Sequence, residues 1–332
     1  MSKLQLPSRA GDAWDGGFLW DTQRDVQAIE ARGGMVVAGG ADFYLLKTGD
    51  ENWKMRPPPE DIGPIDLVAA EPRGGRRYAV ASEKMLALFF KTKMGDQILR
   101  LKPREPGSLV SHLAWGGAKG PCSLYALHND ATLLRMKPDL SDMEELDVEE
   151  MSALASDDNG VVAMVALNGD DSRVYVTRDG TEMKYRHLNH DIDLDTSVEI
   201  AVADTAVALL VDESYVLLSR GLEAPFERIE ILDSPEGRGW KTGPITFQGA
   251  SSDAALLCAR WENELVRIVR VDPSGAATSI LEMGATEAHD PPEIAALSWD
   301  ASRKTLWGAS PYTGIFRAVP PGAKGKKKPL MS

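Results

Sequence analysis

The acidic segment from 189 to 199 has the residue types of a calcium-binding loop. Its carboxylates recur at every second or fourth position: Asp191, Asp193, Asp195 and Glu199. The sharp turn of an EF-hand loop requires a glycine at its sixth position, and Thr196 stands there instead. We therefore expect an acidic surface loop and keep calcium binding as the alternative.

The sequence lacks the motifs of nucleophilic catalysis and of a zinc site. It contains no Gly-x-Ser-x-Gly elbow and no His-Glu-x-x-His, and no histidine has a convincing serine or cysteine partner in the sequence. The cysteines Cys122 and Cys258 stand far apart with no Cys-x-x-Cys partner, which argues against a zinc site and against a disulfide framework. These features favour a protein that is not an enzyme.

The elements that would position functional residues recur along the chain. Apolar runs of strand length, bounded by Gly, Pro, Asp and Asn, alternate with turns, and no window sustains the i, i+3, i+4 pattern of a helix. Their spacing of about 45 residues is typical of propeller repeats. The repeats begin near Val26, Ile65, Val110, Met151, Val198, Ile245 and Ile294.

A fourth strand completes most repeats, but the seventh ends at Val319 without one. We predict that residues 13–21 supply the missing strand, because closing the ring removes exposed sheet edges. The predicted fold class is therefore all-β: a seven-bladed β-propeller of four-stranded antiparallel blades, forming one domain over 1–319. The Pro-, Gly- and Lys-rich residues 320–332 are expected to be a disordered basic tail.

With these repeats the chain resembles the seven-bladed propellers of the WD40-like and degenerate Asp-box (BNR-type) superfamily. Its Trp-Asp pairs are not at WD40 positions, and the turns between third and fourth strands look closer to Asp boxes, whose form is Ser/Thr-x-Asp-x-Gly-x-Thr-Trp. In such repeats the hydroxyl and Asp tie the turn and the aromatic packs on the blade, so the resemblance implies no activity. The matching residues are Thr48, Asp50 and Trp53; Thr177, Asp179, Gly180 and Tyr185; and Ser219, Gly221 and Phe226.

The second residue of each innermost strand is polar or small. Because adjacent strand residues face opposite sides, we expect these side chains to line the central channel. Propeller lactonases, which the chain resembles in this respect, hold calcium with carboxylates and amides at one mouth of the channel. We expect a hydrated polar channel without a cofactor and keep a calcium site as the alternative. The ring consists of Gln27, Asp66, Ser111, Glu199 and Thr246.

Acidic residues gather in the turns and connections that should share one face of the propeller, while Lys and Arg predominate on the other. An acidic face produces an electrostatic field that attracts a basic partner. The other interpretation is that these charges serve only to keep the protein soluble. Trp240 and Trp261 lie in the same loops and predict interface anchors, with packing over the blade as the alternative. The partner-binding candidates are Trp240, Trp261, Glu262, Asp212, Glu213, Asp191, Asp193 and Asp195.

The remaining composition excludes several classes of partner. A net charge of −13 argues against nucleic-acid binding. No apolar run reaches about 18 residues, which argues against membrane insertion, and the absence of a signal-like start and of paired cysteines predicts a cytoplasmic protein. Our first hypothesis is a scaffold or assembly subunit that binds a protein partner with a basic surface. The alternative is a lactonase-like hydrolase that uses Asp66 and Glu199 on a divalent cation.

Overall fold

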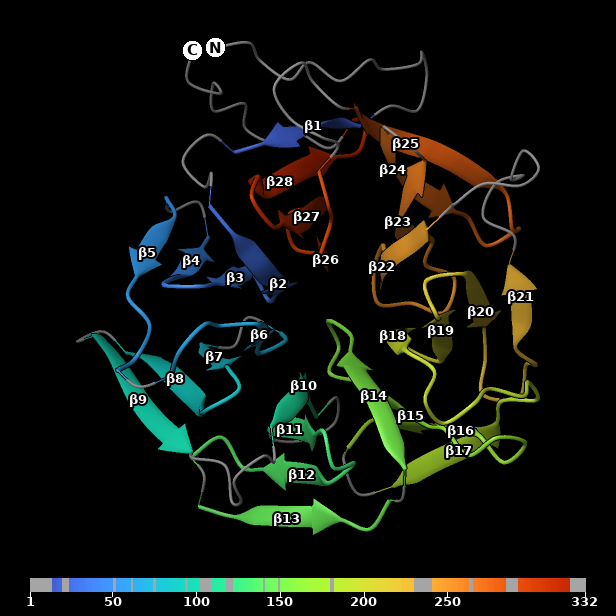
Figure 1. Cartoon of the computed structure of the whole chain (residues 1–332), viewed down its shortest axis with the longest axis horizontal. Coiled ribbons are helices and arrows are strands. Elements are labelled where there is room, and N and C mark those ends of the chain that lie inside the picture. Colours follow the sequence, from blue (N-terminus) through green and yellow to red (C-terminus); the bar gives the residue numbers. More distant parts are fainter. Residues whose placement is uncertain are drawn as a thin grey trace.

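Seven four-stranded sheets stand around a central axis in the computed structural model of the chain (Figure 1). The predicted fold class is confirmed. No helix in the described part is long and apolar enough to cross a membrane. The structure describes residues 14–19, 24–49, 52–60, 62–73, 76–92, 95–101, 109–117, 122–139, 141–148, 150–179, 182–229, 241–262, 265–284 and 292–322.

Each of the first six blades is an antiparallel meander whose strands follow chain order from the axis outward. The first three blades comprise β2 Val26–Arg32, β3 Met35–Gly40, β4 Tyr44–Thr48 and β5 Lys54–Arg56; β6 Leu67–Ala70, β7 Arg77–Ala81, β8 Leu86–Thr92 and β9 Gly95–Leu101; and β10 Val110–Gly116, β11 Ser123–His128, β12 Leu133–Met136 and β13 Met143–Leu146. The next three comprise β14 Met151–Ser156, β15 Val162–Ala166, β16 Arg173–Thr177 and β17 Met183–His187; β18 Val198–Ala203, β19 Ala206–Val211, β20 Tyr215–Ser219 and β21 Glu227–Ile229; and β22 Lys241–Phe247, β23 Leu256–Glu262, β24 Leu265–Val271 and β25 Ala277–Gly284.

The seventh blade is closed by the N-terminal strand, as predicted. It contains β26 Ala296–Asp300, β27 Thr305–Ser310 and β28 Gly314–Val319, and β1 Asp15–Phe18 pairs with the outer side of β28. Trp14, next to β1, is buried against Trp299 at 5.7 Å between ring centroids. The described part of the C-terminal segment ends at Gly322, so the predicted disordered tail lies mostly outside the described residues.

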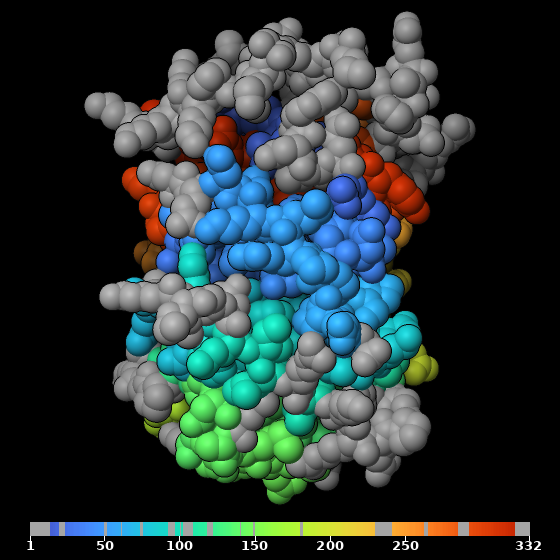
Figure 2. Space-filling view, turned by 90° about the vertical axis from the view of Figure 1, so that its left-hand side faces the viewer, coloured from blue at the N-terminus to red at the C-terminus, as the bar shows by residue number. Residues whose placement is uncertain are grey.

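The core consists of apolar layers between neighbouring blades. Every residue of the second strands β3, β15 and β19 is buried, because each blade packs against a neighbour on both faces. The outermost strand β5 is exposed at every residue, whereas the outermost strand β25 buries Ile280, Leu281 and Met283. Seen from the side, the first three blades stack in chain order from blue through cyan to green (Figure 2). Burying one large apolar side chain contributes about 1.5–3 kcal/mol, so these repeated layers hold the ring together.

The turns with Asp-box character are tied by side chains, as the resemblance implies. The Ser219 hydroxyl donates within its turn to the carbonyl oxygens of Gly221 (3.1 Å) and Ala224 (2.8 Å). Trp53 packs edge-on against Trp307 of the seventh blade, with 5.5 Å between ring centroids. These contacts stabilise the turn and the packing of neighbouring blades.

Candidate functional site

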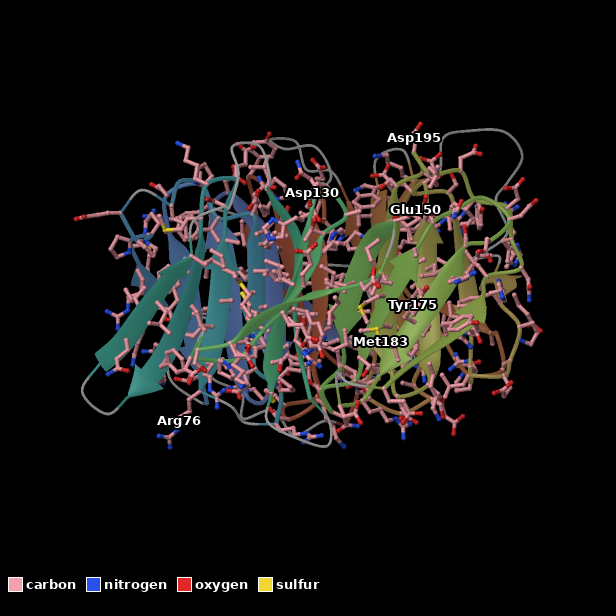
Figure 3. The ribbon with its side chains drawn as sticks, turned by 90° about the horizontal axis from the view of Figure 1, so that it is seen from below. Arg76, Asp130, Glu150, Tyr175, Met183 and Asp195 are labelled. Atoms are coloured by element: carbon pink, nitrogen blue, oxygen red, sulfur yellow. The ribbon has the colours of Figure 1, made fainter. Side chains whose placement is uncertain are left out.

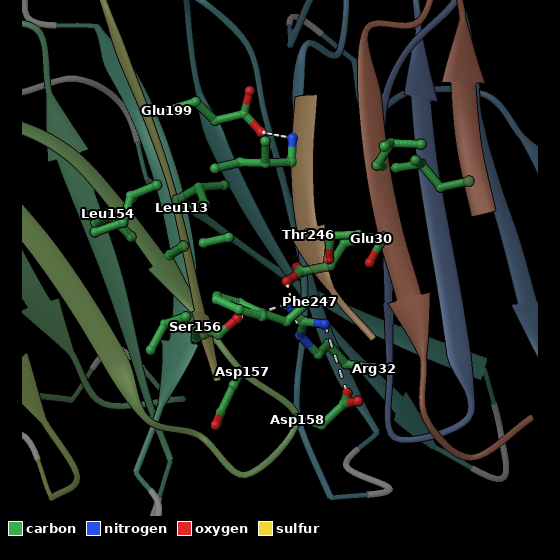
Figure 4. Close-up of a pocket in the computed structure, with 18 of the residues that line it drawn as sticks. Glu30, Arg32, Leu113, Leu154, Ser156, Asp157, Asp158, Glu199, Thr246 and Phe247 are labelled. Carbon is green, nitrogen blue, oxygen red and sulfur yellow. Dashed lines mark hydrogen bonds and ion pairs between the residues drawn. The ribbon is translucent and has the colours of Figure 1, made fainter. Parts of the chain in front are cut away.

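The innermost strands enclose a channel cavity of about 210 Å³. Figure 4 shows Glu199 at one end of it, Arg32 and Asp158 at the other, and Leu113 and Leu154 between them. Apolar side chains from several blades form this middle band, and polar groups gather toward the ends. The band includes Ile29, Val68, Leu113, Leu154 and Leu297.

The end near Arg32 is closed by contacts that cross the axis. Arg32, at the end of β2, donates from Nη2 to the carbonyl oxygen of Ser156 in the fourth blade (2.6 Å). Its Nε lies 3.3 Å from Glu30, and its Nη1 lies 3.7 Å from Asp158. Ser156, Asp158 and Asn159 belong to the β14 end and the turn after it. We call Glu30, Arg32, Ser156 and Asp158 the channel staple.

Asn159, in the same turn, makes hydrogen bonds to two further blades. Its carbonyl oxygen accepts from Arg73 Nη2 of the second blade (2.7 Å), and its Nδ2 donates to Ala250 of the sixth blade (3.1 Å). One turn therefore touches blades on opposite sides of the ring.

The channel staple carries more negative than positive charge. Burial raises the pKa of Glu30, and the Arg32 guanidinium opposes that shift. Burial also raises the pKa of Asp158, again opposed by Arg32. Two buried carboxyl groups therefore share one guanidinium at this end of the channel.

Four blades use a polar side chain to satisfy the backbone of the next blade. Each innermost strand has one free edge, and the N–H groups that point to that edge lack ladder partners. The acceptors are the side chains of Glu30 for Ala70 N, Asp157 for Asp204 N, Glu199 for Ile245 N and Ser298 for Ala31 N, at 2.7 to 2.9 Å. The carboxylate of Glu199 is thus part of a structural pattern as well as of the channel wall.

Glu199 stands at the neck between the channel and a second cavity. Its Oε1 accepts a hydrogen bond from Ile245 N at 2.9 Å. A register shift between Thr242 and Ile245 accommodates Gly243 and Pro244 in β22 as a bulge next to this contact. Burial raises the pKa of Glu199 to about 7, so its charge changes near neutral pH.

The second cavity, of about 540 Å³, opens between the fifth, sixth and seventh blades. We call it the mouth pocket. It combines carboxylates with apolar walls. Its lining is Ser197, Glu199, Leu210, Glu213, Lys241, Gly243, Pro244, Trp261, Glu293, Ile294 and Ala295.

Trp261 and Gly243 fit each other closely in the mouth pocket. A Cβ at Gly243 would meet the Trp261 ring at 2.0 Å, so only glycine leaves room for the indole. Trp261 also packs against the core layer between the sixth and seventh blades. The ring is thereby fixed as one wall of the pocket.

The predicted channel ring is divided by the structure. Glu199 and Thr246 line the channel cavity, whereas Gln27, Asp66 and Ser111 line neither cavity. Gln27 is exposed and donates to Asp25 at 2.5 Å; the Ser111 hydroxyl donates to Leu127 O at 3.1 Å. Register shifts at Gln27 and Ser111 interrupt the strict alternation on which the prediction rested.

The described residues form no group of three or more His, Cys, Asp or Glu side chains suited to a metal ion. Asp191, Asp193 and Asp195 are exposed in the connection before β18. Glu199, the fourth carboxylate of the calcium-loop pattern, lies in β18 and binds the sixth blade instead.

One face of the ring exposes many carboxylates. Figure 3 shows Asp130, Glu150 and Asp195 on one side and Arg76 on the other. The exposed cations described on the same side are Arg24, Arg56, Lys84 and Lys241. We call this side the acidic face; its exposed acids are Asp42, Glu60, Glu83, Asp130, Glu150, Asp170, Asp171, Asp191, Asp193, Asp195, Asp212, Glu213 and Glu293.

Two large apolar side chains are also exposed on this face. Tyr312, in the turn between β27 and β28, is 84% exposed, and Leu194 is 57% exposed. Among the partner-binding candidates, Asp212 and Glu213 are exposed and Trp261 is half-buried. Trp240 lies outside the described residues, and the side chain of Glu262 is not among those described.

Sequence reasoning missed the channel staple, Glu293 and Tyr312. The staple pairs residues 124 apart in sequence, Arg32 and Ser156, so no local pattern reveals it. Tyr312 follows Pro311 in a short turn, and a tyrosine in such a turn is a signal that the sequence does carry.

Comparison with protein-family models and with curated proteins finds no match for this chain. Solved structures do match over nearly its whole length. YCF48 bound to a D1 peptide has a TM-score of 0.64 at 13% identity, covering 96% of this chain and 99% of that one. A streptogramin B lyase has a TM-score of 0.65 at 9% identity, covering 93% and 98%. The Cps50 (Swd1) β-propeller domain of Myceliophteria thermophila has 0.64 at 11%, covering 92% and 99%.

These likenesses show the seven-bladed fold. A peptide-bound protein and a lyase both appear among the similar structures, so the fold alone does not select between binding and catalysis.

Proposed function

We propose that this chain is a non-enzymatic protein-interaction module that binds a partner with a basic surface through its acidic face. The observation that carries the proposal is the excess of exposed carboxylates over cations on the turns and connections of that face. Such an arrangement attracts positively charged surfaces and raises their rate of association.

Several of these carboxylates stand on short, well-defined turns. Asp212 and Glu213 both have left-handed backbone, with φ of 48° and 52°, and Ser214 N donates back to Val211 O at 2.9 Å. The hydrogen bond closes a tight β-turn within the three-residue connection between Val211 and Tyr215. Because the turn is already ordered, it loses little chain entropy when a partner binds.

Exposed apolar side chains provide anchors for a partner on the acidic face. Leu194 stands between Asp193 and Asp195 in the chain, Tyr312 is exposed in a turn on the same face, and tyrosine is enriched among residues that dominate binding energy. A face that exposes both carboxylates and apolar side chains fits a basic segment that also carries apolar side chains. That YCF48, similar in fold, was solved with a peptide supports the feasibility of this mode.

The test is site-specific photo-crosslinking of the full chain in its own cells. A benzoylphenylalanine is placed at Asp193 or Tyr312 on the acidic face, or at the exposed Asp253 in the turn between β22 and β23 on the opposite face. We expect protein adducts from the first two positions, with crosslinked peptides rich in Lys and Arg. Adducts confined to position 253, or acidic crosslinked peptides, would contradict the proposal.

A neutralised variant sharpens the test. Replacing Asp191, Asp193 and Asp195 by asparagine should reduce the yield of the adduct from position 312 roughly tenfold, since three exposed charges each contribute about 0.2–1 kcal/mol. The matched control removes three exposed acids of the opposite face: Glu182→Gln, Glu223→Gln and Asp253→Asn. The control should leave the adduct unchanged.

A further inference from the structure

We propose that the mouth pocket is a socket for an arginine side chain of the partner. This inference rests on the proposed function and names the group that the acidic face recognises. It is carried by three features of the pocket: its size, its unpaired carboxylates and its apolar walls.

The pocket is large enough for a side chain to enter. Its volume of about 540 Å³ lies within the range of about 300–1,000 Å³ that is usual for ligand pockets. Glu213 of the acidic face is part of its lining, so the pocket adjoins that face.

Two carboxylates in the pocket lack a cation. Among the described residues, Glu199 has one hydrogen bond, from Ile245 N to Oε1, and Glu293 has no ion pair. Glu213, in contrast, is already paired with Lys241. Glu199 is half-buried, so its carboxylate gains more from a cation than a carboxylate in open water does, and the exposed Glu293 adds a second carboxylate to the same pocket.

The other walls suit the rest of an arginine side chain. Leu210, Pro244 and Ile294 can cover its methylene groups, and Trp261 adds an indole. A guanidinium is planar, weakly hydrated and stacks on aromatic rings, whereas an ammonium is compact and strongly hydrated. We therefore assign the pocket to arginine in preference to lysine. The acidic side chains Glu199, Glu213 and Glu293 outnumber the one cation of the lining, Lys241, which favours a cation over an anion.

The socket is tested with butylguanidinium, an arginine side chain without its backbone, and with butylurea, its uncharged isostere. The full chain is labelled with 5-fluorotryptophan, and the fluorine resonance of Trp261 is assigned from a Trp261→Phe variant, since the chain has 8 tryptophans. We expect butylguanidinium to shift the Trp261 resonance at a concentration at least tenfold below that of butylurea. Equal effects of the two compounds, or no shift at Trp261, would overturn the proposal.

Charge-neutral variants locate the effect. Glu199→Gln and Glu293→Gln should each weaken butylguanidinium binding at least threefold, measured by the same shift. Glu60→Gln, on the acidic face but outside the pocket, should leave it unchanged. Circular dichroism establishes that each variant is folded. Equal weakening by Glu60→Gln would mean that the general field of the face, and not the socket, binds the cation, which also overturns the proposal.

The two proposals fail in different ways. Crosslinking from position 312 without a selective effect of butylguanidinium removes the socket and leaves the protein-interaction function. Selective butylguanidinium binding without protein adducts from the acidic face supports a guanidinium site but removes the proposed function.

Discussion

Arg32 and Ser156 are joined across the central channel by a hydrogen bond of 2.6 Å from the guanidinium to the main-chain carbonyl. One residue belongs to the first blade and the other to the fourth. Each apolar layer formed by the described residues joins two neighbouring blades, so this contact braces two blades that share none of these layers. The same guanidinium lies beside the carboxylates of Glu30 and Asp158.

Removing the guanidinium should destabilise the whole ring. Arg32→Met keeps most of the side-chain volume but leaves Glu30 and Asp158 without a cation. Breaking a buried ion pair from one side costs about 3–5 kcal/mol, and partial exposure places the expected loss near the lower end. Urea unfolding measures it. Restoring neutrality with Glu30→Gln and Asp158→Asn in the same chain should recover part of the loss.

Arg73→Met is the matched control for this prediction. Arg73 also donates to a carbonyl of the same turn, at Asn159, but in an exposed setting. We expect a loss of about 1 kcal/mol or less there. If the two substitutions cost the same, the channel staple has no special role.

Glu199 should make stability depend on pH near neutrality. Its pKa of about 7 in the folded chain exceeds the ordinary value of 4.5, so between these values the folded state binds more protons than the unfolded state. Stability contributed by this group is full below about 4.5 and is lost as pH rises toward 7. The difference in unfolding free energy between Glu199→Gln and the native chain should therefore increase, by roughly 1–3 kcal/mol, from pH 5 to pH 8.

The measurement is urea unfolding of both proteins across that range, with Glu213→Gln as the control on the exposed rim. Parallel curves for the native chain and Glu199→Gln would show that the carboxyl titrates normally. Because glutamine retains a carbonyl oxygen, the hydrogen bond from Ile245 N is preserved and does not confuse the comparison.

Gly243→Ala should disturb the mouth pocket directly. The added Cβ would meet the Trp261 ring at 2.0 Å, so the indole or the strand must move. Overpacking of this kind costs about 1–3 kcal/mol. Gly17→Ala is a suitable control, because a Cβ at Gly17 has no neighbour within 4 Å.

A double-variant cycle identifies the cause. With Trp261→Ala already present, Gly243→Ala should cost much less, because the opposing ring is gone. Additive losses in the cycle would instead place the strain in the backbone of β22.

At Tyr312 we expect one substitution to increase the stability of the fold and to weaken partner binding. It has a left-handed backbone, with φ of 70°, which is costly for a tyrosine, and it is 84% exposed. Tyr312→Gly should raise stability by about 1 kcal/mol and weaken partner binding. Lys304→Gly, at a φ of 50° on the opposite face, should stabilise similarly without changing binding. Unchanged binding in Tyr312→Gly would remove this anchor.

The sequence predicts the blades well because each strand is short, apolar and bounded by turn residues. Even the closure by residues near Asp15–Phe18 follows, since a missing outer strand leaves an edge to be covered. The first residue of a strand is predicted less well. β22 begins at Lys241, whereas the repeat pattern places its start at Ile245. The pattern misses the earlier residues because Gly243 and Pro244 form a bulge that interrupts the alternation.

The candidate site is harder to predict from the sequence than the blades are. Alternation along β2 and β10 assigned Gln27 and Ser111 to the channel, but register shifts at these positions interrupt the alternation. Glu199 and Trp261 are predicted separately, and their shared pocket depends on how the fifth, sixth and seventh blades meet. Such contacts arise from tertiary packing, which repeat spacing does not encode.

The most direct test of the protein-interaction function is selection of a random peptide library on the immobilised full chain at low salt. The quantity measured is the mean net charge of the enriched peptides, for the native chain and for the chain with Asp191, Asp193 and Asp195 changed to asparagine. We expect strongly positive peptides on the native chain and peptides of clearly smaller net charge on the variant. Enrichment of neutral or acidic peptides, or the same basic peptides on both proteins, would contradict it.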